Sequence, residues 1–145
     1  MTPEQISLVR LSFAQLLDRK VEAGKIFYER LFAIAPETRA MFSTDIEAQG
    51  RKLMETIGTA IGALRDPVKL NGMLASLGQR HVAYGVKDVH YDKVGEALLW
   101  TLEKEFGDAF TPPVRTAWAT LYSTVASVMK GAAAAPARIP LAARA

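Results

Sequence analysis

The sequence predicts an all-α protein. Apolar residues recur at three- and four-residue intervals along most of the 145-residue chain, and no stretch alternates apolar and polar residues between turn signals as a strand does. The helical stretches open at cap-and-proline pairs, such as Thr2-Pro3 and Asp66-Pro67, and short breaks separate them. These signals predict six or seven helices in one domain, with breaks too short to hold a second domain.

The first two helices have clear boundary signals. Thr2, Pro3 and Glu4 predict a helix start, and the apolar face that follows is Ile6, Val9, Phe13, Leu16 and Leu17. A second helix is predicted over residues 21–35, with an inward face made of Ile26, Phe27, Leu31 and Ile34. Pro36 ends this helix, because the residue before a proline disfavours the helical conformation. It also opens a short turn that leads to Met41 and Phe42.

The middle of the chain predicts two further helices. The cap signal Ser43-Thr44-Asp45 precedes a helix with this apolar face: Leu53, Ile57, Ala60, Ile61 and Leu64. Gly58 and Gly62 lie four apart in it and predict a close approach by another helix backbone. Asp66-Pro67 opens the next helix, whose stripe is Leu70, Met73, Leu74, Leu77 and His81, and Gly85 ends it.

The last two predicted helices are followed by a tail. Asp88 is the expected cap of a helix that carries Val94, Leu98, Leu99 and Leu102. Gly107 and Pro112-Pro113 mark a break, and the final helix carries Trp118, Leu121, Tyr122, Val125, Val128 and Met129. Beyond Gly131 the composition shifts to Ala, Pro and Arg without any acid. We therefore predict a folded domain over residues 1–131 and a poorly ordered tail over 132–145.

Composition excludes several kinds of site and partner. The absence of cysteine excludes disulfides, thiolate metal sites and covalent haem attachment. The 18 Lys and Arg exceed the 15 Asp and Glu by three, and two of the cations, Arg138 and Arg144, lie in the tail, so no nucleic-acid partner is expected. The polar start is not a signal peptide, and the longest charge-free apolar stretch, residues 116–129, is too short to span a bilayer. We expect a cytoplasmic protein without membrane insertion.

His81 is the main candidate for chemistry. It continues the helical stripe of Leu70, Leu74 and Leu77, which predicts that it points inward. Such a histidine is commonly a core residue bonded to a carbonyl. The alternative is a neutral imidazole that ligates a metal or haem iron. His90 is nine positions away and off the same helix face, so a paired-histidine metal site is not predicted, whereas non-covalent b-type haem is compatible with the sequence.

Three groups of residues resemble the globin domain of bacterial flavohaemoglobins and the related single-domain haemoglobins. They are Arg80-His81-Val82-Ala83-Tyr84-Gly85-Val86 with His90-Tyr91 and Val94-Gly95, Phe27-Tyr28-Glu29-Arg30-Leu31-Phe32 with Pro36-Glu37-Thr38-Arg39 and Met41-Phe42, and Ala117-Trp118 with Tyr122. The segments keep the family's order and nearly its spacing over about residues 3–130. The resemblance implies a globin fold of six to eight helices around a haem pocket, with haem b as the cofactor.

The same resemblance implies roles for individual residues. His81 resembles the proximal iron ligand, and the residues that resemble the distal side facing bound gas are Tyr28, Gln49 and Leu53. The remaining haem contacts would be Phe42, which wedges against the haem, Val86, Tyr91, Val94 and Leu98 on the proximal side, and Arg80 at a propionate. Tyr28 and Gln49 supply an O–H and an amide N–H donor to polarised dioxygen. High oxygen affinity and slow release are therefore expected, and no distal histidine competes for the iron.

The sequence departs from that family in two places. Flavohaemoglobins continue into reductase domains, whereas this sequence stops at residue 145, so we expect a separate NAD(P)H-dependent reductase to restore ferrous iron. The family also pairs the tyrosine matched by Tyr91 with a late glutamate, and the aligned residue here is Ala133. The proximal imidazole is then less electron-donating, which predicts weaker peroxidase-like reactivity.

Three functions are consistent with these features. The first is reversible binding of dioxygen, and of carbon monoxide and nitric oxide, for oxygen storage or delivery. The second is a nitric oxide dioxygenase that depends on the external reductase. The third is a haem-less or sensor domain that acts through protein partners. The missing reductase segment and the missing glutamate favour binding over catalysis, and a monomer or weak homodimer is expected.

Overall fold

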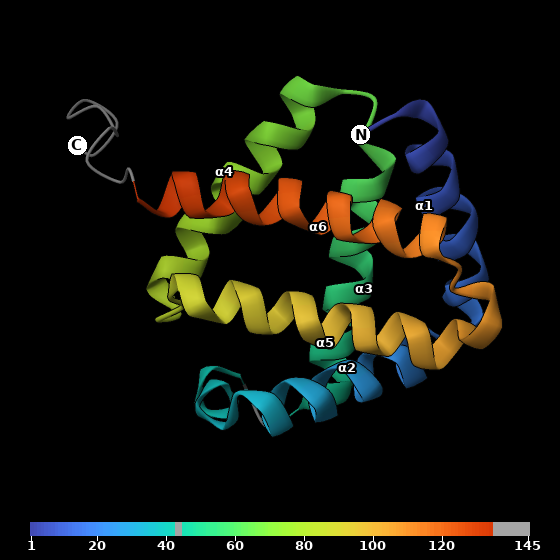
Figure 1. Ribbon diagram of the computed structural model, residues 1–145. Coiled ribbons are helices and arrows are strands. Elements are labelled where there is room, and N and C mark those ends of the chain that lie inside the picture. Colours follow the sequence, from blue (N-terminus) through green and yellow to red (C-terminus); the bar gives the residue numbers. More distant parts are fainter. Residues whose placement is uncertain (43–44, 135–145) are drawn as a thin grey trace.

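The computed structural model describes residues 1–42 and 45–134, and within them all regular secondary structure is helical, without a strand. The six α-helices are α1 (Pro3–Leu16), α2 (Lys20–Ile34), α3 (Ile46–Gly62), α4 (Pro67–Ala83), α5 (Asp88–Phe106) and α6 (Pro112–Ala133) (Figure 1). Three short 3₁₀ helices connect them: η1 (Leu17–Arg19), η2 (Pro36–Met41) and η3 (Gly107–Ala109). The predicted all-α fold is confirmed.

Local side-chain bonds explain where several helices begin. The Thr2 hydroxyl accepts from the Gln5 backbone N–H at 3.1 Å, and the Gln5 side chain accepts from the Thr2 N–H at 3.0 Å, which closes a capping box. Asp66 caps α4 through the Lys69 N–H at 3.2 Å. Each bond satisfies a backbone donor that the first helical turn leaves unpaired.

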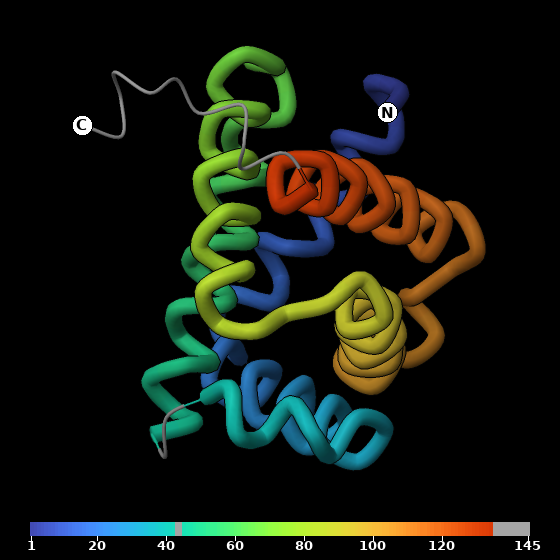
Figure 2. Tube along the Cα trace, turned by 90° about the vertical axis from the view of Figure 1, so that its left-hand side faces the viewer, coloured from blue at the N-terminus to red at the C-terminus, as the bar shows by residue number. Residues whose placement is uncertain are grey.

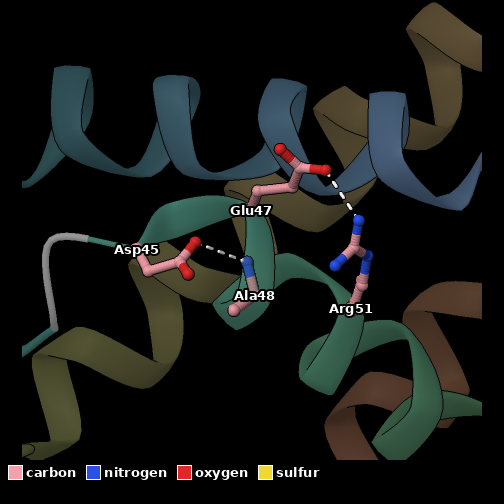
Figure 3. Close-up of polar contacts among 4 residues, drawn as sticks. All are labelled: Asp45, Glu47, Ala48 and Arg51. Atoms are coloured by element: carbon pink, nitrogen blue, oxygen red, sulfur yellow. Dashed lines mark hydrogen bonds and ion pairs between the residues drawn. The ribbon is translucent and has the colours of Figure 1, made fainter.

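The start of α3 is fixed in the same way. Asp45 accepts a hydrogen bond from the Ala48 N–H at 3.0 Å (Figure 3). One turn after Glu47, Arg51 donates a hydrogen bond to the Glu47 carboxylate at 2.7 Å. Ser43 and Thr44, which the sequence placed in the same cap, lie outside the described residues. The Asp45 cap therefore sets the register of the helix that carries Gln49.

Two predictions about helix ends are wrong. Asp88 does not cap α5 but is its first residue, and the Lys87 N–H instead donates to His90 Nδ1 at 2.9 Å. Leu17 does not join the inward face, because α1 ends at Leu16 and the turn of η1 leaves Leu17 47% exposed. The helix α6 also continues to Ala133, two residues into the predicted tail, as the high helix propensity of alanine allows. Residues 135–145 lie outside the described part.

The helices pack in two groups, one made of α1, α4 and α6 and the other of α2, α3 and α5. The helix α4 packs mainly against α6, α1 also packs against α6, and α2 packs against both α3 and α5. Neither α3 nor α4 makes an extensive contact with α5, and Figure 2 shows α5 beside the stacked α3 and α4. The inward faces of α3 and α4 are therefore not covered by α5. No helix among the described residues is long and apolar enough to cross a membrane.

Buried side chains form two clusters. The first cluster joins α1, α2, α3, α5 and the start of α6 and includes Phe13, Tyr28, Leu31, Met54, Leu98, Leu102 and Trp118. The second cluster lies between α3, α4, the start of α5 and the end of α6 and includes Ala60, Leu70, Leu74, Tyr91, Ala126 and Met129. Leu64, Tyr122 and Val125 pack against both clusters, so they connect the two halves of the core.

Glycines permit close helix crossings, but not at the predicted pair. A Cβ on Gly58 would meet the Phe13 ring rather than a backbone, and one on Gly62 would meet nothing within 4 Å. The backbones come together at Gly24 of α2 and Gly50 of α3, where a Cβ on Gly24 would lie 2.9 Å from the Gly50 Cα. The prediction from Gly58 and Gly62 is wrong because helical spacing alone does not tell which face another helix crosses.

Candidate functional site

His81 is held by a bond within its own helix. Its Nδ1 lies 2.7 Å from the carbonyl oxygen of Leu77, one turn earlier in α4. A carbonyl oxygen accepts only, so Nδ1 carries the proton and donates it. In the neutral ring, Nε2 is then left with its lone pair, which is the arrangement that a metal-binding histidine requires.

The surroundings of His81 favour its neutral form. Burial lowers the pKa of His81 below its usual value, and the charge of the adjacent Arg80 lowers it further. The bond to the Leu77 carbonyl acts in the opposite direction, but burial is the largest effect. The side chain is only half-buried, so a neutral imidazole remains accessible to a ligand.

A glycine turn sets the chain direction just after His81. Gly85 has a φ of 83°, in the left-handed region that favours glycine. The Val86 N–H donates to the His81 carbonyl at 3.1 Å and the Gly85 N–H to the Val82 carbonyl at 3.0 Å, which is a Schellman motif. The sequence prediction that Gly85 ends this helix is confirmed. The turn fixes Val86 close to the end of the helix that carries His81.

Tyr91 is the second notable group beside His81. Its ring lies 6.4 Å from the imidazole, centre to centre, with the two planes 29° apart. The Tyr91 hydroxyl is buried and has no hydrogen-bond partner among the described residues, while its backbone carbonyl accepts from the Tyr122 hydroxyl.

Tyr28 of α2 lies in a cluster of aromatic rings. It is 3% exposed, and its ring centre lies 5.1 Å from that of Phe42 and 5.7 Å from that of Phe32. The Phe42 ring meets Tyr28 edge-on, a favourable arrangement for aromatic pairs. Phe42 follows η2 directly and is only half-buried. One side of its ring therefore packs on Tyr28 in the core, and another part of the ring stays accessible.

Tyr28 and Gln49, the two donors predicted for the distal side, are brought together by the glycine crossing. Tyr28 follows Gly24 by one helical turn, and Gln49 directly precedes Gly50, so the contact of the two glycines places both polar side chains between α2 and α3. Burial raises the pKa of Tyr28 to about 12, against the opposing effect of a hydrogen bond with the Gln49 side chain. The Tyr28 hydroxyl therefore remains a proton donor throughout the neutral range.

The other predicted site residues divide between the two clusters. Phe42, Leu53, Val94 and Leu98 pack with Tyr28 in the first cluster, whereas Val86 and Tyr91 pack in the second. The sequence had grouped Val94 and Leu98 with the proximal residues, but the structure groups them with Tyr28. Arg80 is exposed. Gly24 and Gly50 were missed as site-forming residues, because a glycine in sequence does not show its partner.

These features suit a flat apolar group with one polar ligand. Apolar residues of α3, α4 and α5 and of the segments that connect the helices remain half-buried, and they are Phe42, Leu53, Ile57, Leu77, Val86 and Val94. Three of them, Leu53, Ile57 and Leu77, lie on α3 and α4, whose inward faces α5 does not cover. The free Nε2 of His81 and the unpaired hydroxyl of Tyr91 belong to the same region. Haem, with an apolar ring and an iron that takes an axial histidine, fits this set of residues.

Comparison with known proteins identifies the family. The globin family profile matches residues 25–129. The chain is 34% identical to a neuroglobin of the fish Chaenocephalus aceratus, and the comparison covers 84% of this chain and 86% of the relative. Neuroglobins of Tetraodon nigroviridis and Danio rerio are 35% and 33% identical over the same shares. With its helical fold, the chain belongs to the globin family, whose members bind haem and, through it, dioxygen and other diatomic gases.

Proposed function

We propose that His81 is the proximal iron ligand of haem b, and that the chain binds dioxygen reversibly with Tyr28 and Gln49 as its distal donors. The observation that carries the proposal is the bond from His81 Nδ1 to the Leu77 carbonyl, since it leaves Nε2 free to bind. The lowered pKa of His81 supports it, because a protonated imidazole does not ligate a metal.

The apolar residues complete the proposed site. Phe42 and Leu53 would form the apolar wall of the distal side, and the remaining haem contacts would be Val86, Tyr91, Val94 and Leu98. Arg80 is exposed beside His81, so its guanidinium would pair with a propionate at the edge of the haem. Haem supplies the iron at which the gas binds, whereas these residues exclude water and orient the ring.

The polar residues favour dioxygen as the ligand. Dioxygen that draws electron density from iron becomes a hydrogen-bond acceptor, and both Tyr28 and Gln49 offer a donor. Carbon monoxide is less polarised and gains less from the same donors. Tyr28 and Gln49 also interact with each other, so the two donors are held in one region before a gas arrives.

The wider setting follows from the resemblance. We infer a single-domain haemoglobin of the bacterial flavohaemoglobin type, cytoplasmic and a monomer or weak homodimer, whose folded domain includes α6 to its end at Ala133. A separate NAD(P)H-dependent reductase would restore its ferrous iron. Nitric oxide dioxygenase activity with that reductase is the alternative, and oxygen binding is preferred because the aligned glutamate partner of Tyr91 is absent.

Absorption spectra of the haem-loaded chain test the proposal. The ferrous protein is expected to show a five-coordinate spectrum that shifts with carbon monoxide, since the distal side offers Gln49 rather than a histidine. His81→Gly should lose or alter this spectrum, and added imidazole should restore it by occupying the vacated position. His90→Gln, which keeps an acceptor for the Lys87 N–H, is the matched control. An unchanged haem spectrum in His81→Gly would return His81 to a core role.

A further inference from the structure

Glu105 carries a buried carboxyl group far from the proposed haem site. It lies in the last turn of α5, and its side chain is only 3% exposed. Arg19 of η1 places its Nη1 3.3 Å from Glu105 Oε2, and the same nitrogen donates to the Glu105 backbone carbonyl at 3.1 Å. The guanidinium of Arg19 therefore binds both one carboxylate oxygen and the backbone carbonyl oxygen of Glu105.

The other carboxyl oxygen has no such partner. Glu105 Oε1 is buried without a hydrogen-bond donor among the described residues. Glu22, in the first turn of α2, which packs against α5, acts on Glu105 both as a neighbouring charge and as a side chain within hydrogen-bonding reach. Two ionised carboxylates can only accept hydrogen bonds, so their contact leaves Oε1 unsatisfied and adds repulsion. Burial and the Glu22 charge both raise the pKa of Glu105, while Arg19 opposes them.

We propose that Glu22 and Glu105 share one proton under mildly acidic conditions in which exposed glutamates are ionised, and that this proton closes a carboxyl–carboxylate bond between the start of α2 and the end of α5. With the proton present, Oε1 gains the partner that it otherwise lacks. The two oxygens of Glu105 are then both used, one by Glu22 and one by Arg19.

Helix dipoles decide which residue carries the proton. Glu22 lies near the N-terminus of α2, where a negative charge is favoured, and Glu105 lies near the C-terminus of α5, where it is disfavoured. Glu105 is also the more buried of the two. The proton therefore resides mainly on Glu105, and Glu22 accepts its hydrogen bond.

The shared proton makes the packing of α2 on α5 dependent on pH. The groups that act on Glu105 are Glu22 from α2 and Arg19 from η1. The pKa of Glu105 is raised above its ordinary value of 4.5. The hydrogen bond to Glu22 therefore contributes fully to stability below pH 4.5, and its contribution is lost as the pH rises through the raised pKa. The helix α2 also carries Tyr28, so the bond between Glu22 and Glu105 fixes the helix that supplies the proposed distal donor.

Unfolding of the full, haem-loaded chain in urea tests this between about pH 4 and 7. Glu105→Gln keeps the shape and provides a permanent N–H donor to Glu22. We expect its unfolding equilibrium constant, relative to that of the wild type, to fall about tenfold between pH 4 and 7, the worth of one hydrogen bond. Comparison of the two proteins at each pH cancels any effect of haem release common to both.

Glu103→Gln is the matched control, because Glu103 is exposed on the same helix and pairs with Arg115. Its stability relative to the wild type should not improve as the pH rises. Infrared spectra give a direct readout, in which the wild type retains a carboxylic-acid band above the pH where exposed glutamates lose theirs, and Glu105→Gln and Glu22→Gln lack it. Parallel unfolding profiles for Glu105→Gln and the wild type, or the same band in Glu105→Gln, would overturn the proposal.

Discussion

Replacing Tyr28 with Phe is expected to raise the dissociation rate of dioxygen about tenfold to a hundredfold, because one donor to a polarised ligand is worth about 1.5–3 kcal/mol. The ring and its packing against Phe42 and Phe32 are kept, so only the hydroxyl is removed. Stopped-flow displacement of dioxygen by carbon monoxide measures the rate. The rate in the wild type should show no step from Tyr28 in the neutral range, since the pKa of its hydroxyl is about 12.

Tyr84→Phe provides the control for the same chemical change. Tyr84 follows α4 and is 56% exposed, so loss of its hydroxyl should leave the dissociation rate unchanged. Carbon monoxide dissociation should respond less than dioxygen dissociation in Tyr28→Phe, because carbon monoxide is the weaker acceptor. An oxygen off-rate equal to that of the wild type would show that the Tyr28 hydroxyl does not contact the ligand.

Gly78→Ala is expected to destabilise the fold by about 3 kcal/mol and to lower the Tm by about 10 °C. A Cβ at Gly78 would lie 2.5 Å from the carbonyl oxygen of Met129 and 2.8 Å from its Cα, where α4 crosses α6. Backbone atoms cannot rotate away as a side chain can, so one helix must shift. His81 lies three residues further along α4, and its position would shift with the helix. Thermal unfolding followed by circular dichroism measures the effect.

Gly72→Ala is the paired control on the same helix. A Cβ at Gly72 meets nothing within 4 Å, so the change should stabilise the helix by about 0.5–1 kcal/mol through the higher helix propensity of alanine. The two substitutions are chemically identical and should act in opposite directions. Equal stabilities for Gly78→Ala and the wild type would mean that α4 and α6 are not packed backbone to backbone.

Helix boundaries were predictable wherever the signal is local. Thr2, Asp66 and Gly85 act through bonds to residues within five positions, so the sequence contains both partners. The Asp88 prediction failed because α5 begins one residue earlier than expected, so that Asp88 is its first residue, and the local side-chain bond is the one from the Lys87 N–H to His90 Nδ1. The prediction that Leu17 faces inward failed because the apolar periodicity of the sequence continues to Leu17, whereas α1 ends at Leu16. Local signals therefore place a helix end only to within about one residue.

The candidate site was only partly accessible from the sequence. The apolar stripe on α4 was enough to point His81 inward, but the stripe alone did not separate a ligand from a core histidine. The bond from Nδ1 to the Leu77 carbonyl, which leaves Nε2 free, required the coordinates. The distal residues rested on resemblance alone, whereas the contact of Gly24 with Gly50 gives the physical reason why Tyr28 and Gln49 meet.

The sequence by itself determined the helical fold, most helix boundaries and the residue types available for chemistry, because hydrophobic periodicity and capping act over a few residues. Only the tertiary structure decided which glycines let helices cross, which cluster Val94 and Leu98 join, and that Arg19 pairs with Glu105. These contacts join residues that are distant in sequence. Their energies depend on the packing of whole helices, and no local pattern encodes which faces meet.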